Sequence, residues 1–216
     1  MMKRVCTPAY FKDRIRRTDL CKTKAGNPVE LLIITNFNSN QDAIAERKCI
    51  IVTSRVHPGE SNTSFIIEGF LEFIVSNERE AKALRETYVF KIIPMLNPDG
   101  VIVGNYRTNL NGLDLNRQWQ NPSAKMSPEI LAMKEMVKKT LECREIHLFV
   151  DMHGHSRQKN LFVYGCQHNS VTLAKNPKGP LNATTITHHK EKILPIIASK
   201  TIDWFSLNDC NYVVHK

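Results

Sequence analysis

Closely spaced cysteines are absent from this sequence. Its cysteines are scattered along the chain and form no CxxC pair; they are Cys6, Cys21, Cys49, Cys143, Cys166 and Cys210. Disulfide-stapled secreted domains and cysteine-based structural zinc sites both need compact cysteine frameworks. The pattern argues against both classes and predicts reduced thiols in a cytoplasmic protein.

Long hydrophobic runs are absent as well. The longest apolar stretches have the length of β-strands, so we expect no transmembrane helix and no membrane partner. The N-terminal segment MMKRVCTPAYFKDRIRR is basic but lacks the apolar core of a secretory signal. Asp13 and Asp19 argue against a mitochondrial transit peptide, so no targeting peptide is expected.

Nucleic-acid-binding motifs are missing although the chain is basic. It has 30 Lys and Arg against 21 Asp and Glu, a formal net charge of +9 at pH 7. Such a charge attracts anionic partners. The basic residues are dispersed, however, and no recognition motif accompanies them. We therefore expect no nucleic-acid partner, and acidic peptides remain the favoured anionic class.

The composition is that of an ordinary globular protein. Apolar residues make up 42% and charged residues 24% of 216 residues, without internal repeats or a linker. This length suits one domain with a substantial core.

Runs of apolar residues predict several strands. They are VELLIIT (29–35), KCIIVTS (48–54), YVFKII (88–93), IHLFVDM (146–152) and LFVYG (161–165). Continuous rather than alternating runs are typical of strands covered on both faces.

Helical patterns lie between these runs. One predicted apolar stripe contains Ile66, Phe70 and Phe73 or Ile74; a second contains Ile130, Met133, Val137 and Leu141, after Ser127 as N-cap and Pro128 in the first turn. A third pattern, KEKILPIIASKTIDWF, starts or kinks near Pro195. Strands alternating with helices predict an α/β domain with a largely parallel sheet.

Two segments are predicted to be loops. Residues 97–127 are rich in Asn, Gly, Asp and Pro, and loops of this length in compact domains tend to be functional. Residues 166–189 form the second.

Polar clusters follow three of the predicted strands directly. They are HPGE (57–60), NPDG (97–100) and HGHS (153–156). Because the carboxyl ends of neighbouring parallel strands meet at one edge of a sheet, where α/β folds bind ligands, we expect the clusters to converge.

His57, Glu60 and His153 form a candidate metal site in these clusters. Two histidines and a carboxylate are the protein ligands of many catalytic zinc sites. Asp151 could orient a ligand imidazole or be a buried structural residue. HxxE also occurs by chance, and His153 alone equally fits a hydrogen-bonded core histidine.

Arginines in the first loop suggest a second kind of site. The stretches GNYR (104–107) and DLNRQW (114–119) contain Arg107, Arg117 and the neighbouring Asn116. Guanidinium groups bind carboxylates through paired hydrogen bonds, so the loop could hold an anionic terminus. Either arginine alone would be explained equally well as a solvated loop residue.

Together these motifs resemble the zinc metallocarboxypeptidases, in particular their cytosolic branch, which removes glutamates from acidic protein tails such as those of tubulin. The resemblance rests on HPGE, NPDGV, GNYR, DLNRQW and DMHGHS in that order, and extends from about Leu20 to the C-terminus. LCKTKAGNPVELLIIT is similar to the start of that branch's catalytic domain.

The resemblance implies an α/β/α sandwich around a mixed, mostly parallel sheet. It divides the chain into an extension, residues 1–19, and part of a catalytic domain, residues 20–216. It also implies one zinc ion per chain, with His57, Glu60 and His153 as ligands. Asn116 and Arg117 would hold the substrate's terminal carboxylate, and Arg107 would polarise the scissile carbonyl as a catalytic residue.

The family's catalytic glutamate has no counterpart in this resemblance. It is expected downstream of the third ligand, beyond a stretch like FSLNDCNYVVHK, and Glu191, Asp203 and Asp209 do not match its context. The resemblance thus implies a catalytic domain whose C-terminal part is missing, and a lost general base costs about 10² to 10⁴ in rate.

Three hypotheses remain open from the sequence. The first is a metallocarboxypeptidase of the glutamate-removing type. The second is an inactive zinc-containing module that binds acidic C-terminal tails. The third is a fragment that folds poorly because an unfinished sheet exposes an unpaired edge.

Overall fold

The computed structural model describes residues 11–166 and 190–212. The chain divides into two compact units, residues 1–154 and 155–216. The first contains a five-stranded sheet with its helices, and the second contains a helix and irregular segments. Within the described ranges, no helix is long and apolar enough to cross a membrane.

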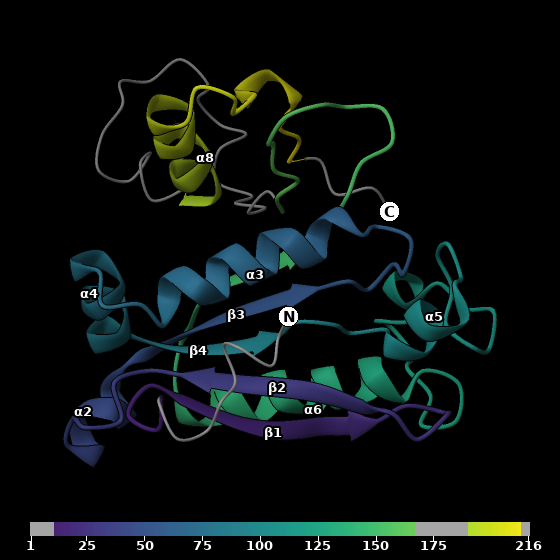
Figure 1. Ribbon diagram of the computed structural model, residues 1–216, viewed down its shortest axis with the longest axis horizontal. Coiled ribbons are helices and arrows are strands. Elements are labelled where there is room, and N and C mark those ends of the chain that lie inside the picture. Colours follow the sequence, from purple (N-terminus) through teal and green to yellow (C-terminus); the bar gives the residue numbers. More distant parts are fainter. Residues whose placement is uncertain (1–10, 167–189, 213–216) are drawn as a thin grey trace, which may run out of the picture. The chain divides into compact units, whose positions relative to one another are not determined.

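The sheet of the first unit is mixed, as predicted. Its strands are β1 (Ile15–Lys22), β2 (Pro28–Ile34), β3 (Lys48–Ser54), β4 (Tyr88–Ile93) and β5 (Ile146–Met152). They lie in the order β1-β2-β4-β3-β5 (Figure 1). β3 is parallel to both β4 and β5, whereas β2 is antiparallel to β1 and β4. β2 to β5 form within one residue of the predicted bounds.

The edge strand β1 was not predicted from the sequence. It pairs with β2 from Ile15 opposite Ile34 to Lys22 opposite Pro28. Its sequence, IRRTDLCK, has few apolar residues and mostly exposed side chains, so hydrophobicity carried no signal. β1 therefore crosses the predicted boundary between the extension, residues 1–19, and the catalytic domain, residues 20–216.

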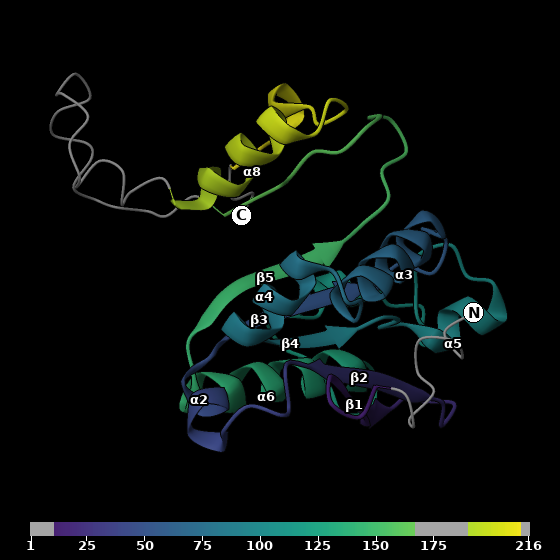
Figure 2. The same cartoon turned by 60° about the vertical axis from the view of Figure 1, so that its left-hand side comes forward.

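Helices cover both faces of the sheet. The helices of the first unit are α2 (Gln41–Glu46), α3 (Asn62–Ile74), α4 (Arg79–Thr87), α5 (Pro98–Val103) and α6 (Pro128–Cys143), with a 3₁₀ turn η1 (Leu115–Arg117). α3 and α6 lie on opposite sides of the sheet in both views (Figures 1 and 2).

Each face has its own hydrophobic core. Leu31 packs with Met133 of α6, whereas its neighbour Leu32 packs with Leu71 of α3. Successive side chains of a strand point to opposite faces, so both must be apolar here. This explains why the apolar runs are continuous.

The predicted stripe of α3 is correct only for Ile74, the alternative to Phe73, and in part for Phe70. The helix buries Ile67, Leu71 and Ile74, whereas Ile66 and Phe73 are exposed. Phe70 packs only at the edge of the core. The sequence NTSFIIEGFLEFI has apolar residues on more than one face, so helical spacing alone allowed two stripes.

The prediction for α6 is correct in its first half. Ile130 and Met133 are buried, but Leu141 is 59% exposed and the buried face continues through Thr140. The helix begins at Pro128 as predicted, although the Ser127 side chain makes no capping hydrogen bond to it.

The loop predictions need correction as well. Residues 97–127 contain α5 and η1. Asn97 caps α5 by accepting a hydrogen bond from Gly100 N at 3.0 Å. From residue 167 onward, the second predicted loop lies outside the described residues.

The second unit has little of the predicted strand. Of LFVYG, only isolated bridges form, Leu161 with Phe205 and Tyr164 with Asn211. The unit also contains a 3₁₀ turn, η3 (Leu207–Asp209). α8 (Lys190–Thr201) begins before Pro195, which lies inside the helix rather than at its start.

Glu129 makes the stability of the first unit depend on pH. Its side chain is 1% exposed, and Oε2 has no hydrogen-bond partner among the described residues. Burial, with a smaller contribution from the charge of Asp99, raises the pKa of Glu129 to about 7. Because the folded pKa exceeds the unfolded one, folding favours the protonated form of Glu129. The contribution of this group to stability is complete below about pH 4.5 and is lost as the pH rises through about 7.

Glu129→Gln should remove this dependence. Between pH 5 and pH 8 the unfolding free energy of the parent chain should fall by about 2 kcal/mol more than that of the variant. Urea denaturation at both pH values measures this, with Glu135→Gln on the exposed side of α6 as control. Equal pH slopes in the parent and Glu129→Gln would contradict the assignment.

Candidate metal centre

The ends of β3 and β5 bring the first and third polar clusters together. Ser54, the last residue of β3, pairs with Met152, the last of β5, in parallel register. His57 and His153 therefore leave the sheet at the same edge. Their ring centroids lie 4.9 Å apart, which confirms the predicted convergence of these two clusters.

The HPGE turn is held tightly against the chain around Tyr106. Arg55 adopts a left-handed conformation with φ 57°, and its Nε donates to the carbonyl of Pro58 at 2.8 Å. Gly59 N donates to the carbonyl of Tyr106 at 2.7 Å. A β-carbon on Gly59 would lie 2.7 Å from that same oxygen, so only glycine fits without a shift.

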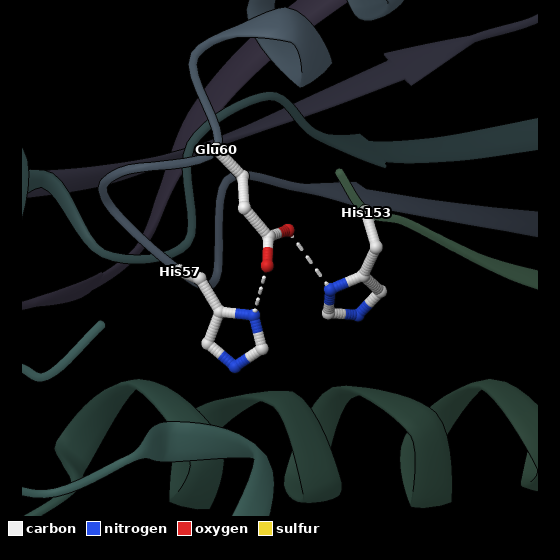
Figure 3. Close-up of side chains that lie close together, drawn as sticks. All are labelled: His57, Glu60 and His153. Atoms are coloured by element: carbon white, nitrogen blue, oxygen red, sulfur yellow. Dashed lines mark hydrogen bonds and ion pairs between the residues drawn. The ribbon is translucent and has the colours of Figure 1, made fainter. Parts of the chain in front are cut away.

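Glu60 lies between the two imidazoles (Figure 3). Its Oε1 is 2.8 Å from Nδ1 of His57, and its Oε2 is 3.1 Å from Nδ1 of His153. The backbone N–H of Gly154 also donates to Oε2, at 2.8 Å. One ligand atom from each of the three residues lies within 4.8 Å of the others.

A second carboxylate holds the far side of each imidazole. Asp114 Oδ1 is 3.1 Å from Nε2 of His57, and Asp151 Oδ2 is 2.6 Å from Nε2 of His153. Thr53 Oγ1 fixes Asp151 by donating to Oδ1 at 2.7 Å. Both rings thus present Nδ1 to the same point beside Glu60.

The loop residues predicted to bind a carboxylate lie beside this cluster. Arg107 Nε donates to Asp114 Oδ2 at 2.8 Å. The Nδ2 of Asn116 is 3.1 Å from Nε2 of His153, while its Oδ1 accepts from Trp119 Nε1 at 3.0 Å. Arg117 is exposed and follows directly in η1. The structure brings Arg107 and Asn116 into contact with the groups that hold the histidines.

Comparison with known proteins identifies the family. The family profile described as zinc carboxypeptidase matches residues 7–203. The chain belongs to the zinc carboxypeptidases. Their α/β fold accounts for the mixed sheet with helices on both faces, and the resemblance drawn from the motifs is confirmed.

Cytosolic carboxypeptidases are among the relatives of this chain. Cytosolic carboxypeptidase 2 of Mus musculus is 47% identical over 198 residues, 91% of this chain and 21% of the mouse protein. Cytosolic carboxypeptidase 1 of Danio rerio is 41% identical over 221 residues, 98% of this chain and 19% of the fish protein. The chain spans about a fifth of the length of these relatives.

A solved structure supports the same family. The metallo-carboxypeptidase from Burkholderia cenocepacia has a TM-score of 0.76 and 27% sequence identity. The similarity covers 100% of this chain and 51% of the bacterial one.

The donor set of this chain fits a zinc ion. Two imidazole nitrogens and a carboxylate oxygen face one point, and each imidazole is oriented by an outer carboxylate, as is common for metal-bound histidines. His57 is buried, but the side chain of His153 is 34% exposed. Solvent can therefore reach one side, as a catalytic rather than a structural zinc site requires.

Electrostatics favour ionised outer carboxylates. Burial would raise the pKa of Asp114, but hydrogen bonds from His57 and Arg107 hold it below its ordinary value. At Asp151 burial is likewise outweighed by the hydrogen bond with His153, and the pKa is lowered. Burial would lower the pKa of His153, but Asp151 and Glu60 raise it overall.

Sequence reasoning missed Asp114. It assigned roles to Asn116 and Arg117 in DLNRQW but none to the first residue of that motif. Asp114 joins the two halves of the site, because its carboxylate contacts both His57 and Arg107. The sequence feature that could have identified Asp114 is its position two residues before Asn116, a candidate carboxylate-binding residue.

Proposed function

We propose that this chain supplies the zinc centre and the carboxylate-binding residues of a metallocarboxypeptidase. Its substrates would be acidic protein tails such as those of tubulin, from which C-terminal glutamates are removed in the cytoplasm. The observation that carries the proposal is the convergence of His57, Glu60 and His153 on one point. The family and the relatives named cytosolic carboxypeptidases support it.

Zinc would be held, one ion per chain, by His57, Glu60 and His153. When bound, zinc acts as a Lewis acid and lowers the pKa of coordinated water. The fixed outer carboxylates Asp114 and Asp151 would keep both imidazoles in the tautomer that leaves Nδ1 free for the metal.

Arg107 would bind the carbonyl of the scissile peptide bond. Its Nε is fixed by Asp114, which orients the guanidinium, and its Nη atoms form no hydrogen bond within the described residues. Donors aimed at developing negative charge stabilise the transition state more than the ground state. Arg107 is therefore the proposed catalytic residue of this chain.

Asn116 and Arg117 would hold the terminal carboxylate of the substrate. Trp119 fixes the amide of Asn116, and the exposed guanidinium of Arg117 makes only a weak contact, 3.4 Å from Nη1 to the carbonyl of Asn116. Arg117 can therefore turn toward a bound anion at little cost. The net charge of +9 would concentrate polyglutamate near the site.

The engaged carboxylates at the centre favour a second candidate function, a zinc-containing binding module. Glu60, Asp114 and Asp151 each hold a histidine, so none is spare to take a proton from water. Such a module would retain acidic tails without cleaving them.

One experiment separates the two functions. The zinc-loaded chain is incubated with a peptide ending in several glutamates, and mass spectrometry follows the release of glutamate. Release supports the peptidase. Binding without release supports the module, and neither release nor binding would contradict both.

Arg117→Gln tests the carboxylate-binding role. It should weaken binding of the glutamate peptide by about tenfold or more, because a charge-assisted hydrogen bond is lost. Arg79→Gln on the exposed start of α4 serves as matched control for the lost charge. A C-terminally amidated peptide should bind the parent chain as weakly as the acid peptide binds Arg117→Gln. Equal binding of acid and amide would contradict the role.

A further inference from the structure

A cavity lies away from the metal centre. It has a volume of about 250 Å³ and lies between β2, β4, α2 and the end of α6. The metal centre is at the ends of β3 and β5, whereas this cavity is near the starts of the parallel strands, where α2 and the end of α6 lie (Figures 1 and 2). None of its lining residues belongs to the site described above.

The charge lining this cavity is entirely positive. Lys91, Lys139 and Arg144 contribute to the wall, and no Asp or Glu does. Within the described part of the chain, none of the three forms an ion pair. Three cations around one small space create a potential that favours an anion.

Lys91 is the unusual member of this group. It interrupts the apolar strand YVFKII and points toward α6, where its Nζ donates to Thr140 Oγ1 at 2.6 Å. Burial is the main cause that lowers its pKa; the charge of Arg144 acts in the same direction, whereas the neighbouring Cys49 and Cys143 act in the opposite one. A partly buried ammonium that forms no ion pair within the described residues is costly unless an anion compensates it.

Arg144 is held in place as the second cation. Its Nη1 donates to the carbonyls of Ile44 and Arg47, at 2.8 and 2.9 Å. These bonds fix the guanidinium at the end of α6, and Arg144 contributes to the lining of the cavity. Lys139 is exposed and lies at the mouth.

The remaining walls are mainly apolar. Ile33, Ile44 and Val89 contribute to that surface, together with Phe37 and Cys143. A space of about 250 Å³ holds several water molecules and can therefore hold a small organic ligand. The match is a compact anionic head with a short hydrocarbon chain.

We propose that this cavity binds a small organic carboxylate with a short alkyl chain. The carboxylate contacts Lys91 and Arg144, the alkyl chain packs on Ile33, Ile44 and Val89, and Lys139 attracts the anion at the mouth.

Methyl NMR of the zinc-loaded chain, titrated with hexanoate, tests the proposal. The methyl signals of Ile33, Ile44 and Val89 should shift in a saturable manner, and they should do so equally in Arg117→Gln, which removes the proposed carboxylate-binding arginine of the metal centre. Hexanol and inorganic phosphate should leave these signals unshifted at the same concentrations.

Two variants examine the role of charge. Lys91→Met, with a similar straight side chain, should weaken hexanoate binding by about tenfold or more. Lys139→Gln should weaken it by a smaller factor, while Lys138→Gln, exposed on the same helix outside the cavity, should not. Unshifted cavity methyls, equal shifts with hexanol, shifts with phosphate alone, or unchanged affinity in both Lys91→Met and Lys139→Gln would overturn the proposal.

Discussion

Replacing His57 with alanine is expected to lower the zinc affinity of this chain by more than about 100-fold. Changes to outer residues of zinc sites cost about 10- to 100-fold, and loss of a direct ligand costs more. His153→Ala should have a similar effect, and because His153 is partly exposed, this variant is less prone to fold poorly. Competition with a chromophoric chelator measures both affinities.

A graded series makes this prediction sharper. Asp114→Asn should reduce zinc affinity by about 10- to 100-fold, since the amide cannot supply the charge that supports His57. His147→Ala, an exposed histidine on β5, should change nothing. Circular dichroism checks that each variant folds. Parent-like zinc affinity in folded His57→Ala and His153→Ala would contradict the ligand assignment.

Gly100→Ala is expected to destabilise the first unit by about 3 kcal/mol and to weaken zinc binding as well. A β-carbon at Gly100 would overlap the ring of Pro58 and lie 2.7 Å from the carbonyl oxygen of Thr108. Pro58 stands between His57 and Glu60 in the HPGE turn. Relief of the overlap therefore has to move the turn that carries two proposed ligands.

The matched control for this change is Gly69→Ala in α3. A β-carbon there meets no atom within 4 Å, so alanine should be neutral or stabilise by about 0.5 to 1 kcal/mol through helix propensity. Urea denaturation compares the variants, and the chelator assay reports zinc affinity. A Gly100→Ala chain as stable as the parent would show that the HPGE turn has more room than described.

Sequence patterns located β2, β3 and β4 because burial on both faces leaves a strong signal. β2 to β5 are apolar almost throughout, so their bounds were predictable to within one residue. β1 is an edge strand stabilised by backbone pairing rather than by burial. The composition of β1 therefore carried little signal, and the family resemblance, which begins at about Leu20, left residues 1–19 as an extension.

Helix faces were harder to predict because the choice depends on the partner surface. In α3 both Ile66 and Ile67 fit helical spacing, but only Ile67 meets the core formed around Leu32 and Phe90. Leu141 in α6 fits spacing too, yet it lies at the end of the helix, beyond the core. Periodicity defines possible stripes, and the sheet decides among them.

The site was predictable where chemistry sits directly at strand ends. His57, Glu60 and His153 follow β3 and β5, and parallel pairing of these strands brings them together. The position of Asp114 depends on the path of the long loop, which no local pattern specifies. For the same reason the cationic cavity around Lys91 was not foreseen, since it is formed by four separate segments.

A crystal structure of the zinc-loaded chain, with anomalous data at the zinc edge, tests the central claim most directly. The account predicts one zinc peak, with Nδ1 of His57, Nδ1 of His153 and a carboxylate oxygen of Glu60 at about 2.0 to 2.2 Å. A zinc peak elsewhere, or a peak bound by fewer than these three residues, would contradict it.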